Sequence, residues 1–151
     1  MKTTVLQSLF KIALLLFGMA IGFGCDDSDE WTQEGIEISC TLAKTVENGT
    51  EVEYPTEIAP ALTLKKDLTF EGDAVCNSIQ GNYRYNADNG RFIIDGLITT
   101  ELACISPYSE AESMYLGYLK KISSSKQEGE SIRLYFGENS YLEYKLTPER
   151  K

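Results

Sequence analysis

AVCNSIQGNYRY (residues 74–85) places a cysteine and an asparagine four residues ahead of a glycine, at the start of a tyrosine-rich strand pattern. Cys76 in this stretch has three conceivable roles: a nucleophile, a metal ligand or one end of a disulfide. A catalytic cysteine normally needs a neighbouring base or cation to form its thiolate. The chain contains no histidine, which excludes Cys-His and Ser-His-Asp catalysis and most zinc sites. The sequence therefore favours a disulfide at Cys76.

The first 24 residues have the features of a secretory signal peptide. Lys2 and Lys11 give a positively charged start, and the apolar run of residues 12–24 is too short to span a bilayer as a helix. A polar, acidic stretch follows at once. We therefore expect residues 1–24 to be removed from the mature protein.

Cys25 stands directly after this apolar run, and its position resembles the bacterial lipoprotein signal, in which the thiol receives a diacylglycerol. Gly24 fits that pattern, whereas Gly22 and Phe23 depart from the usual leucine and small residue. The alternative is cleavage after Ala20, which would leave a soluble protein. We favour lipidation of Cys25, with palmitate among its acyl chains, because nothing else explains a cysteine at this junction. Three acyl chains would hold the protein at a membrane surface.

An acidic cluster follows Cys25, so residues 25–34 are expected to form an acidic tether ahead of a domain spanning residues 35–151. The cluster resembles an export signal that sends lipoproteins to the surface of some Gram-negative bacteria. In other bacteria, an aspartate beside the cysteine favours retention at the inner membrane. We predict a cell-envelope location, at the outer membrane or cell surface. A calcium site is not expected, because the run lacks the glycine and the spaced glutamate of a known loop.

Charge is distributed unevenly along the chain. Residues 26–57 contain ten acidic residues and one base, Lys44, whereas residues 58–151 contain 13 acids and 11 bases. No basic patch with interleaved aromatic residues is present, so the sequence argues against a nucleic-acid partner. The acidity belongs to the tether and the first strands.

Three cysteines remain besides Cys25, at positions 40, 76 and 104, in a compartment where disulfides persist. Cys40 lies in a strictly alternating stretch with Ile36, Ile38 and Leu42, which indicates a buried thiol on the apolar face of a strand. Three pairings are open to three cysteines, and the residues alone do not choose among them.

Most of the remaining chain is typical of short antiparallel strands. Asn-Gly pairs at 48–49 and 89–90 predict hairpins, and a third hairpin is expected to turn at residues 137–140. Residues 62–70 alternate in short segments around a Lys-Lys-Asp turn. The serine-rich stretch of residues 123–130 is expected to be a polar loop.

One segment, residues 106–122, is expected to be a helix. Ser109 and Glu112 have the spacing of a capping box, and Lys120 and Lys121 suit the helix C-terminus. Apolar residues recur at helical spacing and predict a stripe that packs on a sheet; they are Ala111, Tyr115, Tyr118 and Ile122. The fold class is therefore mainly β with one helix (α+β), a small antiparallel barrel or a strongly curved sheet capped by that helix.

These motifs resemble the META domain, the HslJ-like group of bacterial envelope proteins. The family signature is a Cys-Asn pair with glycine four residues after the asparagine, then a threonine four residues before a second cysteine, a helix and a terminal hairpin. The matching residues here are Cys76, Asn77, Gly81, Thr100 and Cys104. The resemblance covers about residues 60–146 and implies a Cys76–Cys104 disulfide.

The chain departs from the family pattern at three positions. Val75 replaces the glycine before the Cys-Asn pair, and Glu101 and Leu102 replace an arginine and a methionine. Trp31 is similar to a tryptophan near the start of such domains. The resemblance implies a location and a fold, and a role in stress tolerance or partner binding, rather than a reaction.

Three function classes follow. The first is a lipid-anchored, non-catalytic envelope protein with no cofactor, metal site or catalytic residue, bound to the membrane through Cys25 and to an unknown protein or small-molecule partner. The second is a small barrel that binds an apolar or glycan ligand through strand tyrosines: Tyr83, Tyr85, Tyr135, Tyr141 and Tyr144. The third, an enzyme, rests on Ser123 and Lys126 in an S-x-x-K pattern without the rest of that motif set. We expect the first.

Overall fold

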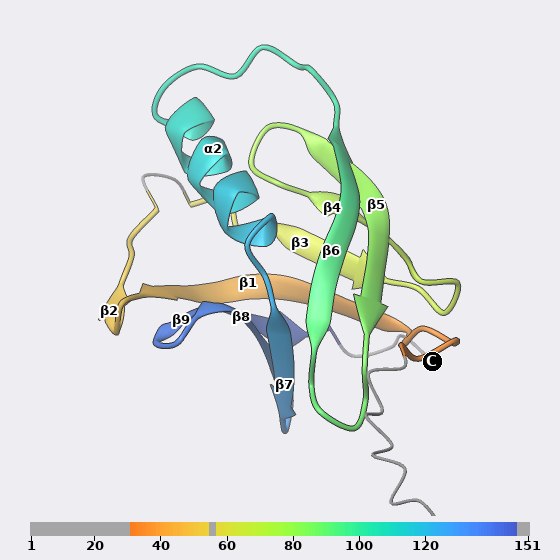
Figure 1. The fold of residues 1–151 in the computed structure, drawn as a ribbon. Coiled ribbons are helices and arrows are strands. Elements are labelled where there is room, and N and C mark those ends of the chain that lie inside the picture. The colour runs from red at the N-terminus through yellow and green to blue at the C-terminus, as the bar shows by residue number, and fades with distance from the viewer. Residues whose placement is uncertain (1–30, 55–56, 148–151) are drawn as a thin grey trace, which may run out of the picture.

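The computed structural model describes residues 31–54 and 57–147, and within them nine strands and one helix are assigned (Figure 1). The signal peptide and Cys25 predicted from the sequence lie outside the described residues. The elements are β1 (Ile38–Glu47), β2 (Thr50–Glu51), β3 (Ala61–Leu64), β4 (Thr69–Asp73), β5 (Ser78–Tyr85), β6 (Phe92–Thr99), α2 (Tyr108–Leu119), β7 (Ser124–Glu128), β8 (Ser131–Gly137) and β9 (Ser140–Leu146).

All nine strands belong to one antiparallel sheet, in the order β6-β5-β4-β3-β1-β9-β8-β7, with β2 paired to β1. The predicted hairpins are confirmed. The Asn-Gly turn at 48–49 joins β1 to β2, and both residues have positive φ angles, as this turn requires. The pairs β5–β6 and β8–β9 form the other two hairpins.

The sheet curls into a half-barrel, which confirms the expected mainly β fold with a strongly curved sheet. Its edge strands meet at one end, where Arg91 forms a bridge with Ser124 and the N–H of Phe92 donates to the Ser123 carbonyl at 3.1 Å. At the other end the edges diverge, and α2 lies across the opening (Figure 1).

The helix contributes the predicted stripe to the core. Ala111 and Tyr115 are fully buried and Tyr118 is almost fully buried; Ile122, also almost fully buried, lies three residues beyond the end of the helix. The hydroxyls of Tyr115 and Tyr144 form a 2.9 Å hydrogen bond between the helix and β9. Tyr83 stacks on Phe92 with ring centroids 5.3 Å apart. Tyrosine thus fills much of the space that the half-barrel encloses, with its polar ends satisfied inside.

The predicted capping box is wrong. The helix begins at Tyr108, with Pro107 at the N-cap position and no side-chain capping bond. Ser109 lies inside the first turn, and Glu112 turns away from the helix start to hydrogen bond with the turn before β5. The helix also ends at Leu119, so Lys120 and Lys121 follow it rather than occupy its last turn.

The predicted polar loop at residues 123–130 is also wrong, because it contains strand β7. This strand pairs with β8 along its whole length, from Ser124 opposite Tyr135 to Glu128 opposite Ser131. Its side chains are polar and mostly exposed, as suits an edge strand with neither face in the core.

Candidate functional site

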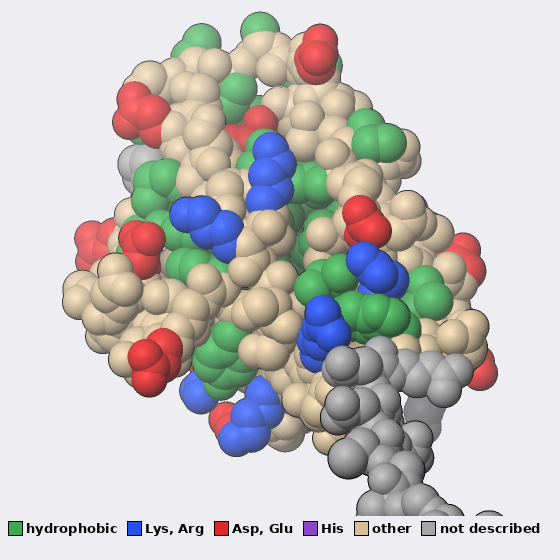
Figure 2. Space-filling view, in the orientation of Figure 1, with side chains coloured by type: hydrophobic (Ala, Val, Ile, Leu, Met, Phe, Trp, Pro, Cys, Tyr) green, Lys and Arg blue, Asp and Glu red, His purple; other side chains and the backbone are tan. Residues whose placement is uncertain are grey.

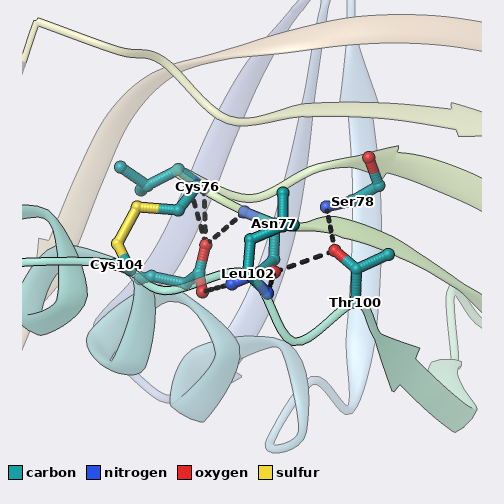
Figure 3. Close-up of a disulfide and its surroundings, with 8 residues drawn as sticks. Cys76, Asn77, Ser78, Thr100, Leu102 and Cys104 are labelled. Carbon is teal, nitrogen blue, oxygen red and sulfur yellow. Dashed lines mark hydrogen bonds between the residues drawn. A yellow bond between two sulfur atoms is a disulfide. The ribbon is translucent and has the colours of Figure 1, made fainter.

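The residues of the Cys-Asn motif meet at the turn between β4 and β5. This turn is closed by a 2.8 Å hydrogen bond from the N–H of Ala74 to the Asn77 carbonyl. Cys76 forms a disulfide with Cys104 in the segment between β6 and α2, with their Cα atoms 6.0 Å apart. The pairing implied by the family resemblance is thus present. Figure 3 shows the bridge with the neighbouring polar side chains.

The turn presents three successive backbone N–H groups to one carboxylate oxygen. The Oε2 atom of Glu112 accepts hydrogen bonds from the N–H groups of Val75 (3.2 Å), Cys76 (2.7 Å) and Asn77 (2.8 Å). Successive N–H groups arranged in this way form an anion-binding concavity. Here the anion is the protein's own glutamate, held 7% exposed on α2.

Asn77 uses both ends of its side-chain amide. Its Nδ2 donates to Glu112 Oε1 at 2.6 Å, and its Oδ1 accepts from the Thr100 hydroxyl at 2.8 Å and from the Leu102 N–H at 2.7 Å. Thr100 Oγ1 in turn accepts the N–H of Ser78 at 3.2 Å (Figure 3). We call these six residues, Cys76, Asn77, Thr100, Leu102, Cys104 and Glu112, the clasp.

The clasp keeps Glu112 ionised. Burial by itself would raise the pKa of this carboxyl, but the hydrogen bonds from the Asn77 side chain and from the backbone N–H groups outweigh it. The pKa of Glu112 therefore lies below its ordinary value. A carboxylate held in this way is a poor general acid or base near neutral pH, because its donors stabilise the charged form.

Gly81 lies apart from the clasp, in the middle of β5 opposite Phe70. A tight bend with positive dihedral angles is a common reason for a glycine, but it does not apply here. Gly81 is not among the residues with positive φ. A Cβ atom at this position would lie 2.8 Å from the Phe70 ring and 2.9 Å from the Gly96 carbonyl oxygen, so close packing excludes a side chain.

Sequence reasoning missed Glu112 as a member of this cluster. It brought together Cys76, Asn77, Thr100 and Cys104, which the structure also does. The available signal was the position of Glu112 between Ala111 and Tyr115, both fully buried. A carboxylate next to a buried helical stripe needs donors from elsewhere in the fold, because burial without them is costly.

Three further residues that the sequence analysis singled out lie outside the clasp. Cys40 is a free, buried thiol on β1, as expected, and burial raises its pKa to about 12. Ser123 donates to the Tyr135 carbonyl, and Lys126 pairs with Glu128 at 2.6 Å, so the S-x-x-K residues are engaged elsewhere. Among the described residues, no group of three metal-ligating side chains lies together.

The start of the described chain packs on the β5–β6 hairpin. The N–H of Thr32 donates to the Tyr85 carbonyl at 2.9 Å. Two guanidinium groups lie over the Trp31 ring, that of Arg84 at 4.9 Å and that of Arg91 at 4.6 Å from the ring centroid. No helix in the described parts of the chain has the length and apolar character needed to cross a membrane.

Comparisons with two solved structures support the fold. A protein from Burkholderia xenovorans, solved by NMR, aligns with a TM-score of 0.61 and 21% identity over 75% of this chain and 83% of that one. A second NMR structure gives a TM-score of 0.51 and 22% identity, over 73% of this chain and 89% of that one. A DUF4847 family protein from Bacteroides vulgatus aligns at a TM-score of 0.47 and 17% identity, over 57% of each chain.

No curated protein sequence matches the chain. The model of the META domain matches residues 40–149, which include every residue of the clasp. Together with the match of the Cys-Asn motif and the curled sheet, this coverage decides the family. The chain belongs to the META domain family.

Proposed function

We propose that this protein is a non-catalytic, lipid-anchored binding protein of the bacterial cell envelope, which supports stress tolerance by holding a protein partner. The observation that carries the proposal is the clasp. Its carboxylate and amide groups are bonded to one another or to backbone, and among the described residues no buried side-chain polar atom lacks a partner. The polar residues of the motif therefore act as structural connections.

The anchor is Cys25, and the domain lies close to it. Trp31 is six positions after Cys25, and a chain of that length spans at most about 22 Å. Because Trp31 packs on the β5–β6 hairpin, we infer that this hairpin lies on the membrane side of the domain. The segment between β6 and α2 lies at the opposite end of the domain from the turn of that hairpin (Figure 1).

The segment between β6 and α2, residues 100–107, forms the partner-binding loop. Leu102 is 65% exposed and Ile105 is 76% exposed, the two largest values among the large apolar side chains of the described residues. Figure 2 shows hydrophobic side chains at this end of the molecule. The loop is held in one shape by the Cys104 disulfide and by the Leu102 N–H bond to Asn77. A rigid apolar loop binds with little loss of conformational entropy.

The chemistry of the loop favours a protein over a second lipid surface. Its charged neighbours, Glu101 and Glu110, are acidic, and an anionic membrane would repel them. We therefore infer a partner with an apolar cleft and basic residues at its rim. Such a partner would be reached by a surface-anchored domain whose loop points away from the membrane.

Two experiments test this proposal. Palmitate labelling of the wild type and Cys25→Ser tests the anchor, and label retained in the variant would contradict it. A photo-crosslinking amino acid at position 105 tests the loop, with position 145 on β9 as the matched exposed control. We expect one protein adduct from position 105 that disappears when Leu102→Asp is added. The same adducts from both positions, or none from 105, would contradict the partner role.

A further inference from the structure

The outer face of the sheet carries a feature that the clasp and the loop do not use. Four residues lie opposite one another on neighbouring strands and form one row across the sheet. Glu51 on β2 is opposite Val46 on β1, Val46 is opposite Tyr141 on β9, and Tyr141 is opposite Tyr135 on β8. The neighbours of the two tyrosines, Leu134 and Leu142, are buried on the inner face. Since side chains alternate along a strand, Tyr135 and Tyr141 point outward.

A hollow of about 400 Å³ lies beside these rings. Its lining includes Lys44, Tyr135, Glu138, Asn139 and Tyr141. The two ring centroids are 5.6 Å apart, and the ring planes are tilted by 55°. The site is thus an open aromatic groove with an amide, a carboxylate and an amine at its margins, and its size suits a small organic ligand.

The groove is preorganised. Two hydrogen bonds join the turn between β1 and β2 to the turn between β8 and β9. The N–H of Gly49 donates to the Asn139 carbonyl at 2.8 Å, and the N–H of Asn48 donates to Ser140 Oγ at 2.9 Å. Arg133, which is outside the lining, lies 4.9 Å from the Tyr141 ring centroid and is held by Glu143 at 2.6 Å. These contacts fix the groove walls before any ligand arrives.

Charge and polarity restrict the ligand class. Lys44 pairs with Glu51 at 3.1 Å, and Glu138 adds a further negative charge, so the groove offers no net positive charge to a phosphate or another anion. A wholly apolar ligand would cover Asn139 and Lys44 without satisfying their hydrogen bonds, which is unfavourable. A neutral, hydroxyl-rich ligand avoids both problems, because it carries no negative charge and can hydrogen bond with Asn139 and Lys44.

We propose that this groove binds a neutral oligosaccharide. The apolar C–H face of a sugar ring stacks on Tyr135 or Tyr141, and its hydroxyls exchange hydrogen bonds with Asn139, Glu138 and Lys44. The strand tyrosines therefore bind a glycan on the outside of the sheet, since Tyr83 and Tyr144 are fully buried inside it. This inference goes beyond the proposed function and names a second ligand for the same domain.

The test is a titration of the purified protein in detergent micelles with neutral tetrasaccharides of glucose, mannose, xylose and N-acetylglucosamine, followed by ¹⁵N NMR. We expect saturable shifts at Asn139 and its neighbours, and binding at least about tenfold weaker in Tyr141→Ala and Tyr135→Ala. Tyr108→Ala, which removes an exposed tyrosine beside the partner-binding loop, is the matched control and should bind normally. Asn139→Ala, in an exposed turn, should also weaken binding while leaving the fold intact.

The absence of saturable binding to every sugar at about 10 mM would overturn the inference, as would binding that none of these substitutions changes. Failure here is distinguishable from failure of the proposed function, since the palmitate and crosslinking tests do not involve the groove. Sugar binding accompanied by chromatographic evidence of cleavage products would support the groove and contradict the non-catalytic role.

Discussion

The Glu112 carboxylate and the Asn77 side-chain amide meet at 2.6 Å, although 35 residues separate them in the sequence. This bond joins the helix to the turn before β5. The same asparagine holds the segment that leads into the helix, through the Leu102 N–H. The clasp thus connects three segments that share no strand pairing.

Removing the charge of Glu112 should destabilise the fold. In Glu112→Gln, an amide replaces a carboxylate that accepts four hydrogen bonds, and its NH2 group faces other donors. We expect a loss of about 2–3 kcal/mol in the free energy of unfolding, measured by urea denaturation. Glu110→Gln is the matched control, because Glu110 is exposed and bonds only to Ser106 among the described contacts; its effect should stay within about 0.5 kcal/mol.

The contribution of Glu112 should also depend on pH. Its pKa is lower in the folded protein than the ordinary value of 4.5, so its stabilisation is present above that value. The stabilisation is lost as the pH falls below 4.5 and through the folded pKa, because the unfolded chain then binds more protons. The difference in unfolding free energy between the wild type and Glu112→Gln should therefore shrink between pH 5 and pH 2.5. A constant difference across that range would contradict an ionised Glu112.

Breaking the disulfide should destabilise the protein without exposing Cys40. The bridge joins residues 28 positions apart, so Cys76→Ser with Cys104→Ser should cost about 3–4 kcal/mol on the chain-entropy model. In the native double variant, iodoacetamide should leave Cys40 unlabelled, because this thiol is 3% exposed and has a raised pKa. In the native wild type it should label neither bridged cysteine. Urea denaturation measures the loss of stability and mass spectrometry of peptides measures the labelling; a labelled Cys76 in the native wild type would refute the bridge.

Alanine substitutions at two glycines, Gly81 and Gly117, should change the stability of the protein in opposite directions. Gly81→Ala would push a methyl group into the Phe70 ring and the Gly96 carbonyl, so it should destabilise the protein by about 1–3 kcal/mol. Gly117→Ala meets nothing within 4 Å on the helix surface and should stabilise by up to about 1 kcal/mol. Thermal denaturation of both variants measures the difference, and equal effects would contradict the packing role of Gly81.

Much of the fold could be predicted from local patterns. The Asn-Gly turns fixed the positions of two hairpins, and the helical spacing of Tyr115 and Tyr118 identified the buried face of α2. Strand β7 could not be predicted in this way, because a polar edge strand has no buried face and therefore no alternation. It forms because β8 offers a free edge.

The candidate site was predicted only in part, for a similar reason. Asn77, Thr100 and Cys104 carry a family pattern, whereas Glu112 fits a local capping box equally well and its true donors are distant in the sequence. The direction of the strand tyrosines was also undetermined. Alternation places Tyr141 and Leu142 on opposite faces of the sheet, but it does not say which of the two faces inward. A bulge in β1 between Leu42 and Lys44 also shifts the in–out alternation of side chains along that strand.

The central claim is that the backbone N–H groups of the Cys-Asn turn are occupied by the Glu112 carboxylate. Amide hydrogen exchange, followed by ¹⁵N NMR at Cys76 and Asn77 in the wild type and Glu112→Gln, tests it most directly. We expect slow exchange at both amides in the wild type and clearly faster exchange in the variant. The Tyr83 amide, which donates to the Leu68 carbonyl, is the control, because its exchange rate should change only with global stability. Fast exchange at Cys76 and Asn77 in the wild type, or protection there that Glu112→Gln leaves unchanged, would contradict the account.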